Sequence, residues 1–332
     1  MKIRLYALTV FAFFAAGLAV PASAEPLKIR ISWSVTPPHI TPLLFENKSI
    51  LRHYAKSYEV ETIRLRGSGP SLTALAANEL DIAGFSYQAL ALGVVNAKLN
   101  LRVVSDVMGV GLNGYGDDEF MARPGEIKSL TDLKGKRIAV NARGSGTDAV
   151  VRKKMLSVGL QDGRDYTIVE IGFSNMLPAL ESKRVDLGFF VAPFDLRAKK
   201  KGYETIFTFG GVLGPTQTLV WAAKKEWLDA NREALKDFFE DALRARRWLM
   251  DPANRTRASE IIAKVTKRKP ENYSDWVFSK DDYYRSPDAR PDLALLQKNI
   301  DDFHALGLIP GTINVSKYAD LSFQEEAVRR LK

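Results

Sequence analysis

The sequence predicts an α/β fold made of two similar lobes. Segments in which apolar and polar residues alternate, as in strands, are followed by segments whose apolar residues have helical spacing, through most of the chain. Such a succession is typical of a parallel sheet with helices on its faces. An internal repeat and two glycine-rich breaks indicate two units of this kind, and a length of 332 residues allows about two domains.

The predicted elements follow one another as strand and then helix. Residues 27–33 alternate apolar and polar side chains, and Pro70 suits the first position of a helix. The strands are expected at 27–33, 58–66, 81–85, 136–141, 167–171 and 185–190, and the helices at 71–79, 149–158 and 175–183.

A segment of the first half of the chain is echoed in the second. Residues 73–85 resemble residues 178–190, at an offset of 105 positions (178 − 73). Both copies have the pattern of a helix, a tight turn and a buried strand, with Asp81 and Asp186 at the same place in the turn. Two βαβ units can look alike through shared physics alone, but either interpretation gives two similar lobes with a cleft between them.

Two glycine-rich breaks, at 109–116 and 210–215, bracket the middle of the chain. They predict that residues 25–115 plus 218–332 form lobe 1 and that residues 116–217 form lobe 2, inserted into it. Two crossings between the lobes would make a two-stranded hinge.

The last third of the chain has a different pattern. Leu235, Phe238, Phe239, Ala242 and Leu243 recur at helical spacing, which predicts an amphipathic helix with one buried stripe. Further helices are expected at 253–265 and 293–306.

Residues 1–24 have the three parts of a secretory signal peptide. Lys2 and Arg4 form a positive start, residues 5–20 are apolar, and residues 21–24 form a small-residue cleavage site. An uncleaved anchor is disfavoured because the apolar run is too short to span a bilayer comfortably. The sequence has no cysteine, so we expect neither disulfides nor a lipid anchor, and we expect the mature chain in the periplasm.

The charge of the chain gives a weaker indication. The formal net charge is +9, and loss of Lys2 and Arg4 with the signal peptide leaves +7 (9 − 2). The basic residues are spread along the chain without a polybasic run or an aromatic–basic RNA motif. Nucleic acid is therefore not an expected partner.

Loops that follow parallel strands gather at one edge of each sheet, where ligands bind. Each lobe is expected to offer three such loops. The candidate ligand-binding residues in them are Trp33, Ser34, His39, Ser68, Gly69, Ser71, Ser86, Tyr87, Gln88, Arg143, Gly144, Ser145, Gly146, Thr147, Phe173, Ser174, Asn175, Pro193 and Phe194.

Two of these loops, 68–71 and 144–148, open predicted helices. Their glycines let the backbone approach a ligand, their hydroxyls can donate hydrogen bonds, and a helix N-terminus carries partial positive charge. Facing each other across a cleft, they would suit a carboxylate or a sulfonate, although each alone could be ordinary N-capping. Arg143 could pair with an acidic ligand, and Trp33 and Tyr87 could pack against an apolar body.

Catalytic patterns are missing from the sequence. It has only three histidines, His39, His53 and His304, and no zinc-protease motif, nucleophile elbow, dinucleotide fingerprint or Walker lysine. We therefore predict that the protein is not an enzyme and that it needs neither a cofactor nor a metal.

The segment 127–140, with Ser129-Leu130-x-Asp132-Leu133-Lys134-Gly135-Lys136-Arg137-Ile138-Ala139-Val140, and the loop 144–147 resemble the nitrate/sulfonate/taurine type of ABC-transporter substrate-binding proteins. This group is related to thiamine-precursor binders. The resemblance implies a type II periplasmic binding protein fold and hinge closure on a ligand. The proline-rich segment 36–42 departs from the family pattern.

The resemblance implies a periplasmic receptor that delivers a small organic anion to an ABC permease in the inner membrane, and we expect a monomer. Two alternatives remain open at this point. One is a ligand sensor that docks to a membrane receptor, and the other is an enzyme of the pyrimidine-synthase-like branch on the same fold, in which His39 would be the residue to test.

Overall fold

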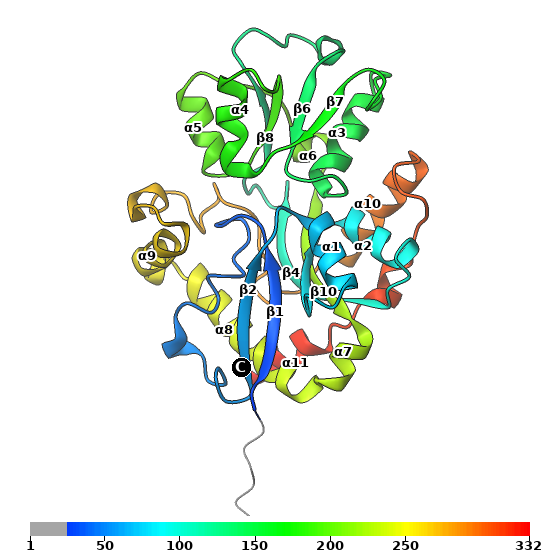
Figure 1. Cartoon of the computed structure of the whole chain (residues 1–332). Helices are drawn as coiled ribbons and strands as arrows, with labels where there is room; N and C mark the ends of the chain where they lie inside the picture. Colours follow the sequence, from blue (N-terminus) through cyan, green and yellow to red (C-terminus); the bar gives the residue numbers. More distant parts are fainter. Residues whose placement is uncertain (1–24) are drawn as a thin grey trace, which may run out of the picture.

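Two five-stranded sheets organise the part of the chain that the computed structural model describes, residues 25–332 (Figure 1). The predicted signal peptide lies outside the described residues. The first sheet has the order β2 (Tyr58–Arg64), β1 (Leu27–Trp33), β3 (Ile82–Phe85), β10 (Thr216–Lys224), β4 (Leu101–Val110). The second has the order β7 (Thr167–Glu170), β6 (Arg137–Val140), β8 (Leu187–Phe190), β5 (Glu119–Ala122), β9 (Glu204–Thr208).

The predicted α/β lobes are confirmed, but both sheets are mixed and not parallel throughout. In the first sheet β1 runs parallel to β2 and β3, but β10 is antiparallel to both β3 and β4. The second sheet repeats this arrangement, with β5 antiparallel to β8 and β9. The reason is that β10 and β5 enter their sheets from the other lobe. Their direction is therefore set by the segment that connects the two lobes. A helix that connects two strands of the same sheet would have made them parallel.

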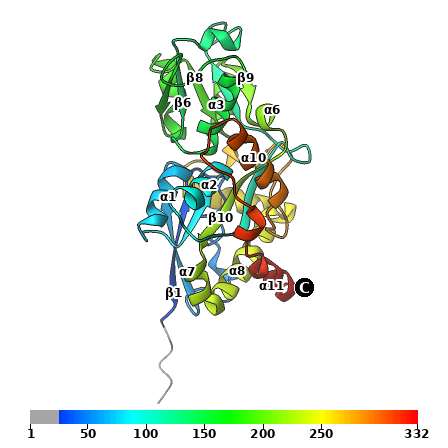
Figure 2. The ribbon, with the colours of Figure 1, turned by 90° about the vertical axis from the view of Figure 1, so that its right-hand side faces the viewer.

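The chain passes between the sheets twice. It leaves the first sheet at Val110 and enters the second at Glu119, and it returns from Thr208 to Thr216 through a short helix. Figure 2 shows the two lobes from the side, with β10 in the lower one. The strands β4 and β10 pair with each other up to Val110 and Thr216, next to the crossings.

Helices cover the sheets on both sides. The first lobe carries α1 (Ser68–Ala76), α2 (Tyr87–Val95), α7 (Lys225–Ala230), α8 (Arg232–Met250), α9 (Arg255–Thr266), α10 (Leu293–Ala305) and α11 (Ser322–Arg330). The second carries α3 (Gly146–Leu156), α4 (Met176–Glu181), α5 (Phe194–Lys200) and, at the return crossing, α6 (Phe209–Leu213). Short 3-10 helices lie at Lys48–Ile50, Leu130–Leu133, Phe173–Asn175, Pro252–Asn254, Pro270–Asn272 and Val315–Tyr318. None of the helices from residue 25 onward is long and apolar enough to cross a membrane.

Five helices, α2, α5, α6, α7 and α11, were not predicted, and the sequence of α2 explains why it was missed. It reads Tyr-Gln-Ala-Leu-Ala-Leu-Gly-Val-Val and is buried on nearly all sides, so it has no polar face from which a helical period could be recognised. Tyr87 and Gln88, expected in a loop, lie in its first turn.

The internal repeat is a structural one. Asp81 accepts hydrogen bonds from the backbone N–H and the guanidinium of Arg30 in the middle of β1, at 2.8 to 3.0 Å. Asp186 accepts one from the backbone N–H of Arg137 at the start of β6, at 2.8 Å. Both aspartates therefore fix the turn from helix to strand, at the sheet edge away from the other lobe, as their sequence positions predicted.

The amphipathic helix predicted around Leu235–Leu243 is α8, and all five of its predicted core residues are buried. Its Phe238 ring stacks on Phe45 at 5.6 Å and meets Tyr58 edge-on at 5.5 Å. The buried Asp241 of the same helix accepts hydrogen bonds from the N–H groups of Arg52 and His53 at 2.8 Å and from the Tyr58 hydroxyl at 3.0 Å. This carboxylate fastens the loop before β2 to α8.

Replacing Asp241 by Ala is expected to lower the free energy of unfolding by about 3 kcal/mol, because three donors lose a charged acceptor in a buried place. Guanidinium titration followed by circular dichroism measures the effect. The control Asp229→Ala removes an exposed partner of Lys225 and should cost less than about 1 kcal/mol. Equal losses in both variants would contradict this role of Asp241.

Candidate functional site

A small cavity of about 60 Å³ lies where the two sheets face each other. The parallel strands β1 and β3 end at this edge of the first sheet, and β6 and β8 end at the facing edge of the second (Figure 1). Loops from both lobes therefore meet here. The described residues that line the cavity are Ser34, Val35, Pro38, His39, Gly67, Ser68, Ser86, Met108, Asp118, Asn141, Ser145, Gly146, Thr147, Phe173, Phe189, Val191, Phe209, Thr218 and Leu219. We call it the central cavity.

Three helices begin at the wall of the central cavity. Ser68 is the first residue of α1, Ser86 is the N-cap of α2, and Ser145 is the N-cap of α3. The first N–H groups of a helix have no acceptor within the helix and carry partial positive charge. Helix starts from both lobes thus surround one point, and this arrangement favours an anion.

Hydroxyl groups and one amide complete the polar wall. The Ser145 hydroxyl donates to the carbonyl of Ala142 at 2.6 Å, and the Thr147 hydroxyl donates to Asn141 Oδ1. Ser68 Oγ accepts from the backbone N–H of Ser86 at 3.0 Å, which joins the starts of α1 and α2. These contacts hold the hydroxyl oxygens in place before any ligand arrives.

The two lobes touch around the central cavity, so this structure is a closed form. The Tyr87 hydroxyl of the first lobe donates to the carbonyl of Gly146 in the second at 3.1 Å. In the other direction, Asn141 Nδ2 donates to the carbonyl of Arg66 at 2.7 Å. A Cβ atom on Gly69 would lie 2.5 Å from the carbonyl oxygen of Arg143. The closed contact therefore requires glycine at position 69.

His39 is a neutral histidine. It is buried, its Nδ1 accepts from the N–H of Ser34 at 3.3 Å, and its Nε2 lies 3.2 Å from Ser34 Oγ. Burial lowers the pKa of His39 to about 3, and the nearby Arg285 lowers it as well. Because Nδ1 accepts a hydrogen bond, the ring proton belongs on Nε2, where it can donate to the serine hydroxyl.

Asp118 is the carboxyl group in the wall of the central cavity. Burial raises the pKa of Asp118 well above its usual range, and the nearby Asp117 and Asp195 add to this. The Tyr283 hydroxyl donates to Asp118 Oδ1 at 2.5 Å and accepts from the N–H of Ala192 at 3.1 Å. Among the described residues that line the cavity there is no Lys or Arg, so no cation there offsets this carboxyl.

The structure brings eight of the sequence-predicted site residues into the wall of the central cavity. They are Ser34, His39, Ser68, Ser86, Ser145, Gly146, Thr147 and Phe173. A second group lines a neighbouring pocket: Trp33, Ser174, Pro193 and Phe194.

The remaining predicted residues lie outside both pockets. The Arg143 guanidinium pairs with Asp162 at 2.7 Å and donates to the carbonyl of Ile168 at 3.1 Å, so it stabilises the second lobe. Tyr87 is fully buried, with its ring stacked on Phe303 at 5.1 Å. The others are Gly69, Ser71, Gln88, Gly144 and Asn175.

Sequence reasoning missed the residues that the crossing segments contribute. Met108 of β4 and Thr218 and Leu219 of β10 line the cavity, as do Asp118 and Phe209 at the two crossings. The glycine-rich breaks at 109–116 and 210–215 indicated where the chain crosses between the lobes. They did not indicate that residues next to these crossings line the central cavity. Asn141 was predicted as the last residue of a strand and follows β6 directly in the structure, so a polar residue at a strand end was the one signal that could have indicated it.

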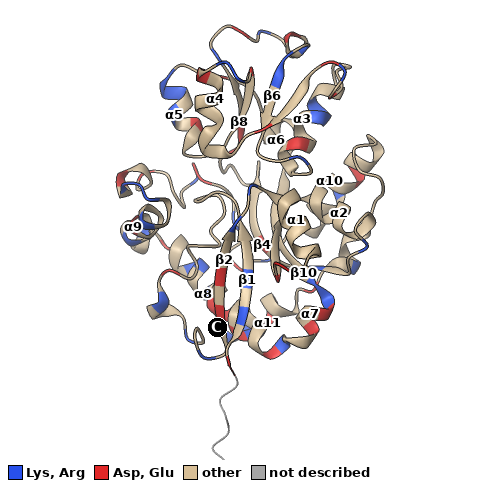
Figure 3. Cartoon of the chain, viewed as in Figure 1, with Lys and Arg blue, Asp and Glu red and all other residues tan. Residues whose placement is uncertain are grey.

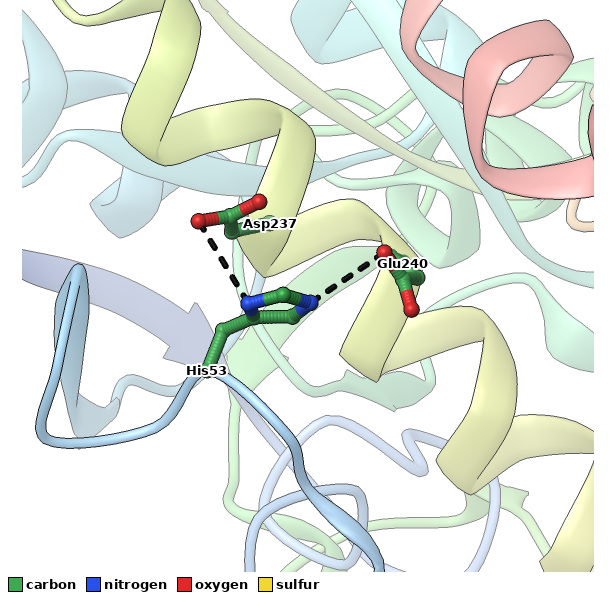
Figure 4. A group of neighbouring side chains, drawn as sticks. All are labelled: His53, Asp237 and Glu240. Atoms are coloured by element: carbon green, nitrogen blue, oxygen red, sulfur yellow. Dashed lines mark hydrogen bonds and ion pairs between the residues drawn. The ribbon is translucent and has the colours of Figure 1, made fainter. Parts of the chain in front are cut away.

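A cluster of possible metal ligands is formed by His53 in the loop before β2 and by Asp237 and Glu240 on α8 (Figure 4). His53 Nδ1 is 3.5 Å from Asp237, and its Nε2 is 3.2 Å from Glu240. Arg330 contacts both carboxylates, at 2.8 and 3.3 Å, and Arg244 contacts Glu240 at 2.6 Å. Because two arginines already neutralise these carboxylates, we interpret the cluster as an ion-pair network that fastens the loop of His53.

Comparison with known proteins identifies the class and the family. The architecture of two mixed α/β lobes is the type II periplasmic binding protein fold. Residues 23–263 match the model of the NMT1-like family, so this chain belongs to the NMT1-like family. It is also 28% identical over 170 residues to a Haemophilus influenzae protein named for thiamine biosynthesis, and the match covers 51% of each chain. It therefore spans about half the length of that curated relative.

Solved structures share the fold at low sequence identity. The alkanesulfonate-binding protein SsuA from Xanthomonas axonopodis, bound to MOPS, has a TM-score of 0.68 and 18% identity, over 90% of this chain and 99% of that one. The nitrate-binding protein NrtA from Synechocystis PCC 6803 has a TM-score of 0.71 and 13% identity, over 93% of this chain and 90% of that one. The desulfurization enzyme DSZB has a TM-score of 0.61 and 15% identity, over 92% of this chain and 100% of that one. The predicted resemblance to the nitrate and sulfonate binders is confirmed, and the fold also carries an enzyme.

Gly69→Ala is expected to hold the lobes apart, because the added Cβ would collide with the Arg143 carbonyl. Small-angle scattering should give this variant a larger radius of gyration than the wild type. Gly172→Ala is the matched control, since a Cβ there meets nothing within 4 Å. Identical scattering from the two variants would contradict the closed contact.

Asp118→Asn is expected to remove a pH dependence of stability. A carboxyl whose pKa is raised by folding destabilises the folded state increasingly as pH rises from its unfolded value of about 4 towards the folded value. The gain in melting temperature of Asp118→Asn over wild type should therefore grow with pH above about 4. Tyr283→Phe should extend the wild-type dependence to higher pH, because the Tyr283 hydrogen bond lowers the pKa of Asp118 and its loss raises that pKa further. A gain that stays constant with pH would refute a neutral Asp118.

Proposed function

We propose that this chain is the periplasmic solute-binding receptor of an ABC importer and that it captures a small organic anion in the central cavity. The observation that carries the proposal is the convergence of three helix N-termini, from both lobes, on one enclosed point. Partial positive charges in that arrangement stabilise an anionic group without a basic side chain. Membership of the NMT1-like family and the fold of SsuA and NrtA support it.

The other half of the wall favours an apolar body on the ligand. Val35, Phe173, Phe189, Phe209 and Leu219 line it, and they offer no hydrogen bonds from their side chains. A sulfonate or carboxylate group would lie against the helix starts while a short apolar part lies against these side chains. The volume of about 60 Å³ restricts the ligand in the closed form to a small one.

Capture by lobe closure follows from the contacts between the lobes. Tyr87 reaches the start of α3 and Asn141 reaches the loop before α1, so closing the lobes completes the ring of helix starts. A ligand that touches both sides would stabilise the closed form relative to the open one. An ABC permease in the inner membrane would then take the ligand from the closed receptor.

Hydrolysis or group transfer is less well supported by the same residues. Ser34 and His39 lie within hydrogen-bond distance, as a nucleophile and its base would. However, burial lowers the pKa of His39 to about 3, far below the range of an effective general base near neutral pH. No described carboxylate forms a hydrogen bond with its ring to orient it. We therefore propose a binding function and no catalysis.

The ligand can be found with a panel of sulfonates, carboxylates and pyrimidines. At 100 times its Kd, a ligand should stabilise the folded protein by about 2.7 kcal/mol, which a thermal shift detects. Thr147→Val should weaken binding of the active compound about tenfold, since a hydroxyl next to the anion is lost. The exposed Thr256→Val is the control. No stabilising compound, or one that binds Thr147→Val unchanged, would count against the proposed site.

A further inference from the structure

A second pocket, of about 290 Å³, lies beside the central cavity and shares Val35 as a wall with it. Residues from both lobes form it. Trp33 and Arg64 lie at the ends of β1 and β2, Lys267 and Arg268 follow α9, and Phe194 begins α5 of the second lobe. We call it the lateral pocket.

The lateral pocket is lined by basic side chains without acidic ones. Arg64, Lys267 and Arg268 line it, and the wall contains no Asp or Glu among the described residues. None of the three forms an ion pair with a described carboxylate. The Arg64 Nε donates only to the carbonyl of Ser34 at 3.2 Å. Figure 3 shows basic residues on both α5 and α9, which lie on the same side of the molecule.

A further arginine strengthens this positive charge. The guanidinium groups of Arg197 and Arg268 lie 6.0 and 5.7 Å from the centre of the Phe194 ring. Burial lowers the pKa of Arg197, and repulsion by Arg268 lowers it as well. Cations held close together without a counter-ion repel one another, so an anion between them would stabilise this arrangement.

One cation of the pocket is held against the wall by an aromatic ring. The Arg64 guanidinium lies over the Trp33 ring, 5.4 Å from its centre, and both residues line the pocket. Guanidinium and ammonium groups are typical partners of phosphate and sulfate groups in proteins. The chemistry of the wall is therefore that of an oxyanion site.

We propose that the lateral pocket binds an oxyanion, that is, a phosphate, sulfate or sulfonate group, through Arg64, Arg268 and Lys267. This site is distinct from the central cavity, which uses helix starts and no basic side chain. It recognises charge at the opening between the lobes, where guanidinium groups stay partly hydrated. The inference does not depend on the transport role, because it concerns anion binding by the purified protein alone.

The test is calorimetric titration of the purified mature chain with inorganic phosphate and with sulfate at low ionic strength. Binding should be detected for the wild type and should weaken about tenfold or more in Arg64→Gln and in Arg268→Gln, because each loses a charge-assisted hydrogen bond. Arg255→Gln is the matched control. It lies at the other end of α9, about 17 Å from the pocket, and should bind as the wild type does.

Equal weakening in all three variants, or no binding by the wild type, would overturn the lateral site. Thr147→Val should leave phosphate binding unchanged, which separates a failure of this site from a failure of the central one. Titration in the presence of the compound found by the thermal panel identifies the source of the group. Additive binding indicates a free oxyanion, and displacement indicates an oxyanion group carried by the ligand itself.

Discussion

The N–H groups at the starts of α1, α2 and α3 point their partial positive charge at one small cavity, and much of the surrounding structure follows from accommodating them. The arrangement results from topology. The parallel strands β2, β3 and β6 all end at the facing edges of the sheets, so the helices α1, α2 and α3 that follow them must begin there. Hydroxyls of Ser68, Ser86 and Ser145 satisfy neighbouring backbone groups, which leaves the remaining N–H groups for a ligand.

The positive helix starts at the central cavity are also compatible with the charge state of the other side chains in its wall. Its two ionisable side chains, His39 and Asp118, are both shifted towards their neutral forms by burial. A neutral carboxyl beside the helix starts does not compete with an anionic ligand for their positive charge. Tyr283 holds that carboxyl from the last third of the chain, which links the C-terminal segment to the hinge.

The sequence predicted β1, β2, β3, β6, β7 and β8, about half of the helices and the two-lobed fold, because these depend on local patterns that survive in the three-dimensional structure. The turns at Asp81 and Asp186 are an example, since a single carboxylate fixes each of them. Sequence reasoning missed β4, β5, β9 and β10, which flank or follow the crossings between the lobes. The direction of β10 could not be predicted, because it is set by a crossing between lobes that no local pattern records. The position of Arg143 was equally hidden: its partner Asp162 is 19 residues away, and only the fold brings the two together.

The helix starts lie at the central cavity and the arginines lie in the lateral pocket, and this separation has a physical reason. A guanidinium group in a cavity of about 60 Å³ would lose its water on closure, and burying a charge is expensive unless it is paired. Backbone N–H groups at a helix start are held in place by the helix, so the proposed binding of an anion to them would need no further ordering. Arg64 and Arg268 lie instead in a wider pocket that both lobes share, where their charge can attract an anion before the lobes close. In the proposed mechanism, closure of the lobes would then pass the anion from the basic side chains of the lateral pocket to the N–H groups at the helix starts in the central cavity.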